Sequence, residues 1–140
     1  MGDLPLTAFG KKEAQASGRR LAARGIRFDV AYTSRLSRAQ SSCSLMLAEM
    51  GQGGTEICRS EALNERDYGD LTGLDKNEVR RRWSDDQVQT WRRSYLTAPR
   101  NGESLRDTVA RLLPYYVSTI LREVMRGRTD ANTAVGVKTV

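Results

Sequence analysis

Two short strand-like stretches, each directly following a helical stripe, constrain the fold of this chain more than any other feature. Small and apolar residues recur at helical spacing from Thr7, a predicted N-cap, to a stop signal at Gly25. Residues 28–34 then alternate and are rich in strand formers, and a second helical stripe covers 36–50. Residues 56–59 have the composition of another short strand. This helix–strand–helix–strand order predicts an α/β domain with a mostly parallel sheet.

The second half of the chain predicts a polar loop followed by helices. Residues 60–74 hold polar residues and glycines without periodicity, as an active-site loop would. Ser84 opens a capping-box pattern that predicts a helix as far as Tyr95, and Ser104 predicts the start of the last helix. Pro114 should kink that last helix or divide it in two. The apolar side chains expected to form its buried face are Leu105, Val109, Leu112, Leu113, Tyr116, Val117, Ile120, Leu121 and Val124.

Charge and composition indicate a globular protein with an anionic partner. The chain has 23 basic and 17 acidic residues, a net charge of +6, and most of the basic residues are arginine. The planar arginine fork pairs with phosphate or carboxylate, so the partner is either a small phosphorylated metabolite or a nucleic acid. No stretch approaches the ~20 apolar residues that span a bilayer, and we expect a cytoplasmic protein without a membrane partner. We expect Cys43 and Cys58 to be reduced.

The absence of histidine restricts the chemistry of the chain. Histidine is the usual proton carrier and phosphoryl acceptor near neutral pH, so any mechanism has to run without it. The two cysteines lack the CxxC spacing of metal sites, and we expect no metal.

The first of three candidate clusters lies where the strand at 28–34 meets the following helix. Arg35 and Arg38 lie one turn apart there, and backbone N–H groups at a helix start favour anions. The alternative is a solvated helix face whose arginines pack their aliphatic stems.

The second cluster lies in the loop at 63–73. Glu65 beside Arg66 suits a carboxylate placed for proton transfer, with a pKa set by its neighbours. The alternative is a surface loop whose charges neutralise one another.

The third cluster is the arginine pair Arg92 and Arg93, which follows Trp91. Adjacent residues on a helix point about 100° apart, so both reach one ligand only near a helix end or a concave wall. A basic run beside tryptophan also suits nucleic acid, and for the arginines at 80–82 a solvated helix face is the alternative.

These clusters together resemble the 2,3-bisphosphoglycerate-dependent phosphoglycerate mutases of the histidine phosphatase superfamily, in their short-loop bacterial type. The matching strings follow the family's order between residues 4 and 127, and the combination of NERDYG, TGLDK and WRRSY is specific to the mutase branch. The strings are LPLTAFGKKEA, FDVAYTSRLSRA, ALNERDYGDLTGLDK, DDQVQTWRRSY and NGESLRDTVARLLPYY. The resemblance implies a three-layer α/β/α sandwich.

The resemblance also implies roles for individual residues. Glu65 would donate and accept the proton at the phosphoryl-transfer step, and Arg38 would hold the transferring phosphate. Residues 66–68 would line the ligand pocket, and Lys76 with the arginine pair would bind the substrate's phosphate and carboxylate. The full set of implied ligand-binding residues is Arg38, Glu65, Arg66, Asp67, Tyr68, Lys76, Arg92 and Arg93.

The implied activity is interconversion of 3-phosphoglycerate and 2-phosphoglycerate in glycolysis and gluconeogenesis, through a phosphohistidine. The implied cofactor is 2,3-bisphosphoglycerate without a metal. The implied partners are a small phosphorylated substrate and further copies of the chain in a homo-oligomer, rather than nucleic acid.

The chain also departs from the family pattern. The family's Arg-His-Gly motif lies on a first, central strand that would precede Asp3, and a second histidine lies on a strand after the last helix. We therefore expect one partial domain over 1–140, family-like over 1–127 and with a divergent tail at 128–140, in which only 134–137 could form a strand. Such a chain should not catalyse the mutase reaction alone. The alternative is a non-catalytic, arginine-rich module that binds anions or nucleic acid, which a flat basic stripe through residues 80–82 would favour.

Overall fold

The computed structural model describes residues 3–130 of this chain. Their contacts divide into two compact units, one comprising residues 65–115 and the other residues 3–64 together with 116–130. The prediction of a single domain stays a prediction. The expected weak strand at 134–137 lies outside the described residues.

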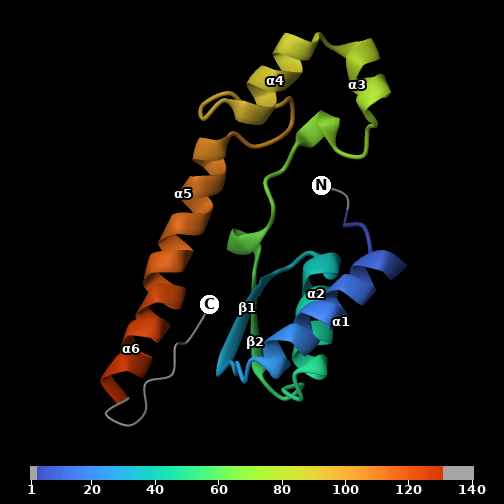
Figure 1. The fold of residues 1–140 in the computed structure, drawn as a ribbon. Helices are drawn as coiled ribbons and strands as arrows, with labels where there is room; N and C mark the ends of the chain where they lie inside the picture. Colours follow the sequence, from blue (N-terminus) through green and yellow to red (C-terminus); the bar gives the residue numbers. More distant parts are fainter. Residues whose placement is uncertain (1–2, 131–140) are drawn as a thin grey trace. The chain divides into compact units, whose positions relative to one another are not determined.

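The larger unit contains a helix–strand–helix–strand sequence (Figure 1). Its elements are α1 (Ala8–Ala23), β1 (Val30–Ser34), α2 (Ser37–Glu49) and β2 (Glu56–Ser60). The two strands pair in parallel, with Val30 opposite Glu56 and Ser34 opposite Ser60. The predicted α/β fold with a parallel sheet is confirmed, and α1 starts at the predicted N-cap Thr7, whose hydroxyl accepts from the Gly10 N–H at 3.0 Å.

Helix α1 packs closely against α2 at a glycine. A Cβ placed on Gly18 would lie 2.5 Å from the carbonyl oxygen of Met46 and 2.9 Å from the Cβ of Glu49. The missing side chain therefore lets the two backbones approach each other. An ion pair at 3.0 Å between Arg19 and Glu49 flanks this contact.

The smaller unit is helical. It contains a 3₁₀ turn, η2 (Gly69–Leu71), and the helices α3 (Lys76–Arg82), α4 (Asp85–Arg93) and α5 (Leu105–Tyr115). Helix α4 begins at the predicted cap Ser84 but ends at Arg93 rather than at Tyr95, because the backbone of Ser94 is already extended.

A small apolar core holds this unit together. Leu71, Val79 and Val88 are buried, and Trp83 and Trp91 pack against them. The two indole rings meet edge to face, with 5.6 Å between ring centroids and an interplanar angle of 77°. The core therefore joins α3 and α4 to the loop that precedes them.

The last helical run divides near Pro114, as expected. Helix α5 is followed by a π-helix, η3 (Tyr116–Leu121), and then by α6 (Arg122–Asp130). Proline has no N–H to donate to the carbonyl four residues earlier, so the regular α-helical hydrogen-bond pattern is interrupted there. Within residues 3–130, no helix has the length and apolar character needed to cross a membrane.

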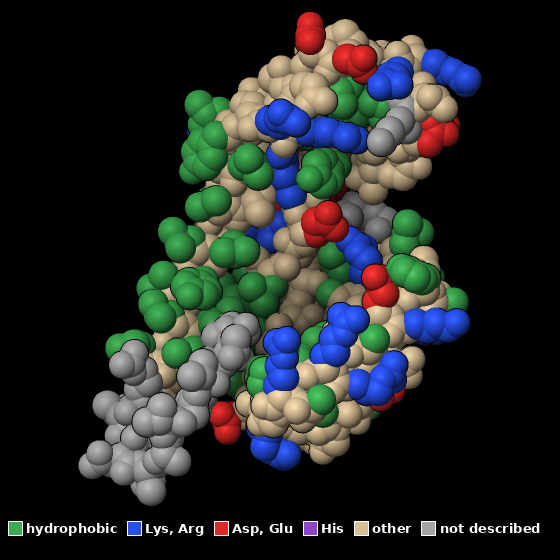
Figure 2. Space-filling model, viewed as in Figure 1, with side chains coloured by type: hydrophobic (Ala, Val, Ile, Leu, Met, Phe, Trp, Pro, Cys, Tyr) green, Lys and Arg blue, Asp and Glu red, His purple; other side chains and the backbone are tan. Residues whose placement is uncertain are grey.

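The predicted buried face of this helical run is largely wrong. Of the nine residues expected to be buried, Ile120 is buried at 3% exposure, and Leu112 and Val124 are half-buried. Figure 2 shows hydrophobic side chains on the surface of this helical run. The exposed ones among the nine are Leu105, Val109, Leu113, Tyr116, Val117 and Leu121. Periodicity identifies an apolar face, but only an element packed against that face buries it.

Candidate functional site

The segment Glu65–Tyr68 carries four of the predicted site residues and has no helix or strand of its own. Glu65 is exposed, Arg66 is buried at 6% exposure, and Asp67 and Tyr68 are half-buried. A segment without a hydrogen-bond ladder needs other partners for its backbone groups. The loop before α5 supplies several of them.

Two glycines let the loop before α5 approach this segment. A side chain on Gly69, whose φ is +52°, would clash with the carbonyl oxygen of Arg100. A Cβ on Gly102 would lie 2.7 Å from the carbonyl oxygen of Asp67. The Asp70 N–H donates to the Arg100 carbonyl at 3.0 Å, so the two backbones are in direct contact.

The buried guanidinium of Arg66 binds three backbone carbonyls. Its Nε donates to Glu103 at 2.7 Å, its Nη1 to Arg92 at 3.2 Å and its Nη2 to Trp91 at 2.5 Å. The carbonyls of the last turn of a helix have no partner within the helix, and a cation there also suits the helix dipole. Arg66 therefore anchors the C-terminal end of α4, and its Cζ lies 5.3 Å from the centroid of the Tyr68 ring.

Arg92 and Arg93 are the last two residues of α4, and both are exposed. A helix end is one of the two settings in which adjacent arginines can reach the same ligand. Because Arg66 binds the carbonyls of this last turn, the backbone that carries the pair is held in place.

Asp67 and Tyr68 serve local structure. The Asp67 carboxylate accepts from the Gly69 N–H at 2.9 Å, which stabilises the turn into η2. The Tyr68 ring packs against the apolar core beside Leu71. Their predicted contacts with ligand stay predictions.

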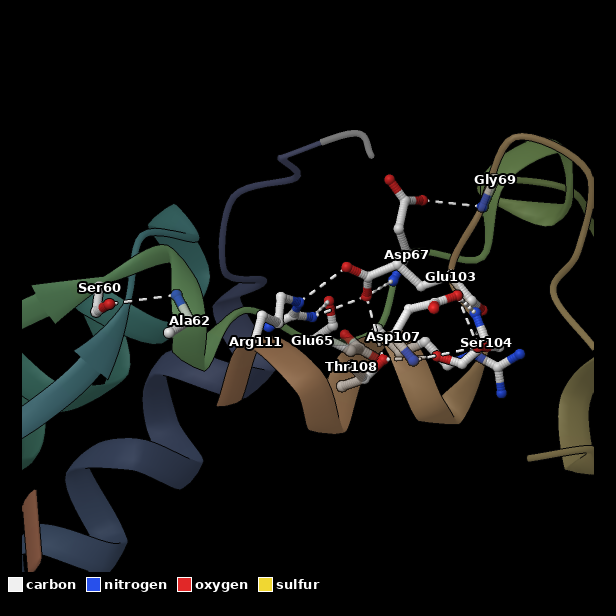
Figure 3. A network of polar contacts seen from close by, with 11 residues as sticks. Ser60, Ala62, Glu65, Asp67, Gly69, Glu103, Ser104, Asp107, Thr108 and Arg111 are labelled. Carbon is white, nitrogen blue, oxygen red and sulfur yellow. Dashed lines mark hydrogen bonds and ion pairs between the residues drawn. The ribbon is translucent and has the colours of Figure 1, made fainter. Parts of the chain in front are cut away.

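A carboxylate–guanidinium pair lies beside the same segment (Figure 3). Arg111 donates to Glu103 through Nε at 2.8 Å and through Nη2 at 2.9 Å, and Nη2 also donates to the Glu65 carbonyl at 3.2 Å. Glu103 further accepts from the Asp67 N–H at 3.2 Å and from the Thr108 hydroxyl at 3.2 Å. The Arg111 hydrogen bond is the main cause that holds the pKa of Glu103 below its usual range.

Sequence reasoning did not assign a role to Glu103 or Arg111. The available signal was their eight-residue spacing across the start of the last helix, with Glu103 just before its first residue, Leu105, and Arg111 within it. Such a spacing is common on solvated helices, so it would not have distinguished this pair from a surface ion pair.

Arg38 belongs to the larger unit, at the start of α2, and is half-buried. The N–H and hydroxyl of Ser37 both donate to the Asp3 carboxylate, at 2.8 and 3.0 Å. The helix start that was predicted to favour anions therefore binds a carboxylate of this chain. Arg35 donates its N–H to the Asn64 amide oxygen at 3.0 Å.

The structure thus brings the segment 65–68 and the α4 arginines together within one unit. Lys76 is the first residue of α3 in the same unit, and its side chain is not described. Within residues 3–130, no cluster of three or more potential metal-binding side chains occurs.

A cavity of about 450 Å³ lies in the larger unit. Its walls are residues 27–32, Glu56 and Cys58 of β2, and Glu123 and Val124 of α6. Burial, followed by the charges of Glu56 and Glu123, raises the pKa of the Cys58 thiol. None of the predicted site residues lines this cavity.

The comparisons with known proteins identify a family. The model of the histidine phosphatase superfamily (branch 1) matches residues 1–131. A protein of Methylorubrum extorquens, named 2,3-bisphosphoglycerate-dependent phosphoglycerate mutase, is 61% identical over 125 residues, which are 89% of this chain and 59% of that protein. A protein of the same name from Xanthobacter autotrophicus is 58% identical over 134 residues, which are 96% of this chain and 65% of that protein. The chain spans about three fifths of the length of these relatives.

Solved structures share the fold. A mycobacterial glucosyl-3-phosphoglycerate phosphatase in complex with inorganic phosphate matches with a TM-score of 0.72 and 23% identity, over 94% of this chain and 58% of that chain. YhfR of Bacillus stearothermophilus matches with a TM-score of 0.69 and 29% identity, over 86% of this chain and 57% of that chain. These likenesses agree with an incomplete α/β fold.

Proposed function

Because this chain belongs to the histidine phosphatase superfamily (branch 1), we propose that it carries the phosphoglycerate-binding part of a 2,3-bisphosphoglycerate-dependent phosphoglycerate mutase. The observation that carries this proposal is the anchored pair Arg92 and Arg93, held beside the Glu65 segment by the buried Arg66. Identity of 55–61% to proteins named as such mutases supports the substrate class.

Five of the predicted residues have a direct role in this proposal. Arg92 and Arg93, together with Lys76, bind the phosphate and carboxylate of 3-phosphoglycerate, and Arg38 contributes to the transferring phosphate. In a complete mutase Glu65 would be the proton donor and acceptor, which its exposed position permits. Phosphoryl transfer depends chiefly on positive charge around the equatorial oxygens, so an arginine-rich site suits this chemistry.

The donor set also fits 2,3-bisphosphoglycerate, the cofactor that the family resemblance implies. Arg92 and Arg93 are exposed, and each guanidinium offers five N–H donors, so two neighbouring arginines suit a highly charged anion.

We also propose that the chain of 140 residues does not turn over alone. The mutase reaction implied by the family needs a histidine as phosphoryl acceptor, and the chain contains none. Arginines bind and stabilise a phosphoryl group but do not accept it covalently. In this proposal the chain binds ligand without catalysis.

The alternative, an arginine-rich nucleic-acid module, has weaker support. A continuous basic stripe would have to pass through residues 80–82, but Arg80 lies 3.4 Å from the carboxylate of Asp85. Asp86 adds a second acidic side chain at the start of α4. These acids interrupt a phosphate-binding stripe.

Assembly into a homo-oligomer and a cytoplasmic location are further parts of the proposal. The exposed apolar side chains of α5, among them Val109 and Leu113, would favour self-association. Analytical ultracentrifugation between 5 and 200 µM, as rough limits suited to weak association, would detect it.

The function is tested by isothermal titration of the purified chain with 3-phosphoglycerate and 2,3-bisphosphoglycerate, with a mutase assay in parallel. We expect saturable binding without turnover, and Arg92→Ala should weaken it on the order of tenfold, because a charge-assisted hydrogen bond is lost. Arg81→Ala is the matched control, since Arg81 is an exposed arginine of the neighbouring helix α3.

Two results would contradict the proposal. Equal weakening in Arg81→Ala and Arg92→Ala would mean that only the net charge attracts the anion. Turnover by the 140-residue chain would show that a group other than histidine accepts the phosphoryl group.

A further inference from the structure

The segment that carries Glu65 is tied to the loop before α5 through one residue, Glu103. The Glu103 N–H donates to the Asp67 carbonyl at 2.8 Å, and its side chain accepts from the Asp67 N–H at 3.2 Å. Its own carbonyl accepts from Nε of Arg66 at 2.7 Å. Glu103 therefore contacts two consecutive residues of the site segment with both backbone and side chain.

Arg111 completes this arrangement from the second half of α5. Its fork binds both carboxylate oxygens of Glu103, at 2.8 and 2.9 Å, and one of the same nitrogens binds the Glu65 carbonyl at 3.2 Å (Figure 3). The two side chains are only 24% and 26% exposed. A bidentate pair with little solvent access has a defined geometry, unlike an open surface pair.

We propose that Glu103 and Arg111 are positioning residues of the ligand site, a statement that rests on the proposed function. Neither has to touch the ligand. Arg111 fixes the backbone of Glu65, and Glu103 fixes Asp67 and, through its carbonyl, the guanidinium of Arg66. Because Arg66 in turn binds the last turn of α4, the pair sets the spacing between Glu65 and Arg92.

This arrangement predicts an effect that depends on the ligand. Inorganic phosphate can bind to the α4 arginines alone, whereas the larger 3-phosphoglycerate would also contact the segment 65–68, which is predicted to line the ligand pocket. Loosening the Glu65 segment should therefore weaken the larger ligand more than the smaller one. A loss of global stability would lower the apparent affinity of both ligands by the same factor.

The test compares Arg111→Met, Arg111→Lys and Glu103→Gln with Arg106→Met. Arg106 is the control, because it lies on the same helix and pairs with Asp107 at 3.8 Å with its side chain 60% exposed. The dissociation constants for 3-phosphoglycerate and inorganic phosphate are measured by calorimetry. Amide hydrogen exchange at Asp67 is measured by NMR without ligand.

We expect Arg111→Met to weaken 3-phosphoglycerate binding on the order of tenfold and phosphate binding by less than about twofold, with partial rescue in Arg111→Lys. Exchange at Asp67 should accelerate in Arg111→Met and in Glu103→Gln, but not in Arg106→Met. Equal weakening of both ligands, or unchanged binding of both, would overturn the inference.

The exchange measurement separates this inference from the proposed function. If the wild-type chain binds neither ligand, the proposed phosphoglycerate site is contradicted, and so is the proposal that Glu103 and Arg111 position it. A wild-type chain that binds 3-phosphoglycerate, with unaltered exchange at Asp67 in Arg111→Met, would leave the function standing and overturn the positioning role alone.

Discussion

Nη1 of the buried Arg66 donates to the carbonyl oxygen of Arg92 at 3.2 Å, so one arginine of the site supports the backbone of another. The two residues had been assigned the same kind of role from sequence. The structure separates them, because Arg66 is 6% exposed and binds three carbonyls, whereas Arg92 points its charge to solvent. Substitutions at the two positions should therefore have different consequences.

Arg66→Met should destabilise the smaller unit by about 3 kcal/mol, because three carbonyls lose a charged donor that methionine cannot replace. Arg93→Met is the control and should change stability by no more than about 0.5 kcal/mol, since Arg93 is exposed. Urea unfolding followed by tryptophan fluorescence measures both, because Trp83 and Trp91 lie in this unit. Equal destabilisation in the two variants would contradict the anchoring role.

Gly69→Ala and Gly73→Ala separate two costs of adding a side chain. Both glycines have positive φ, +52° and +78°, but a Cβ on Gly69 would clash with the Arg100 carbonyl while a Cβ on Gly73 meets nothing within 4 Å. We expect about 1 kcal/mol of destabilisation for Gly73→Ala, from conformation alone. For Gly69→Ala we expect about 3 kcal/mol, because the two loops must also separate. A larger drop in the thermal unfolding midpoint for Gly73→Ala than for Gly69→Ala would contradict this expectation.

The lowered pKa of Glu103 predicts how acid affects stability. Hydrogen bonds from Arg111, then from the Asp67 N–H, favour the ionised carboxylate in the folded state. The folded pKa is therefore below the unfolded value of about 4.3, so the stabilisation is present above that value and is lost as the pH falls through the folded pKa. In Glu103→Gln the free energy of unfolding should fall less between neutral and acidic pH than in the wild type, as measured by urea unfolding. Glu13→Gln, at an exposed position of α1, is the control for this measurement.

Local signals in the sequence predicted most helix and strand positions. The cap residues Thr7, Ser84 and Ser104 each open a helix in the structure, because a side-chain oxygen that accepts a backbone N–H acts within three residues. The strand at 30–34 was also predicted, from its content of strand formers, although its burial does not alternate: the consecutive residues Thr33 and Ser34 are both buried.

Contacts between distant residues were not predictable in the same way. Arg66 was assigned to the ligand pocket from the family resemblance, and only the position of the Trp91 and Arg92 carbonyls shows why this arginine is buried. The apolar face of α5 was expected in a core, but what covers a helix face is set by tertiary packing. Leu113 illustrates this, at 51% exposure.

The contact between Asp3 and Ser37 predicts a measurable coupling at the start of α2. The Asp3 carboxylate accepts from both the N–H and the hydroxyl of Ser37, at 2.8 and 3.0 Å, and so caps the helix from outside it. Asp3→Ala should destabilise the larger unit by about 1 kcal/mol, through loss of this cap and of a favourable interaction with the helix dipole. Glu13→Ala is the control, since Glu13 is an exposed acid on α1.

A double-mutant cycle with Ser37→Ala tests whether the effect comes from this contact. The Asp3–Ser37 hydroxyl bond is absent in either single variant, so the double variant should be less destabilised than the sum by about 0.5 kcal/mol or more. The backbone N–H of residue 37 remains in Ser37→Ala, so Asp3 should keep part of its effect there. Strict additivity in urea unfolding, with the Asp3→Ala loss unchanged in the Ser37→Ala background, would mean that Asp3 acts through the backbone N–H and its charge alone.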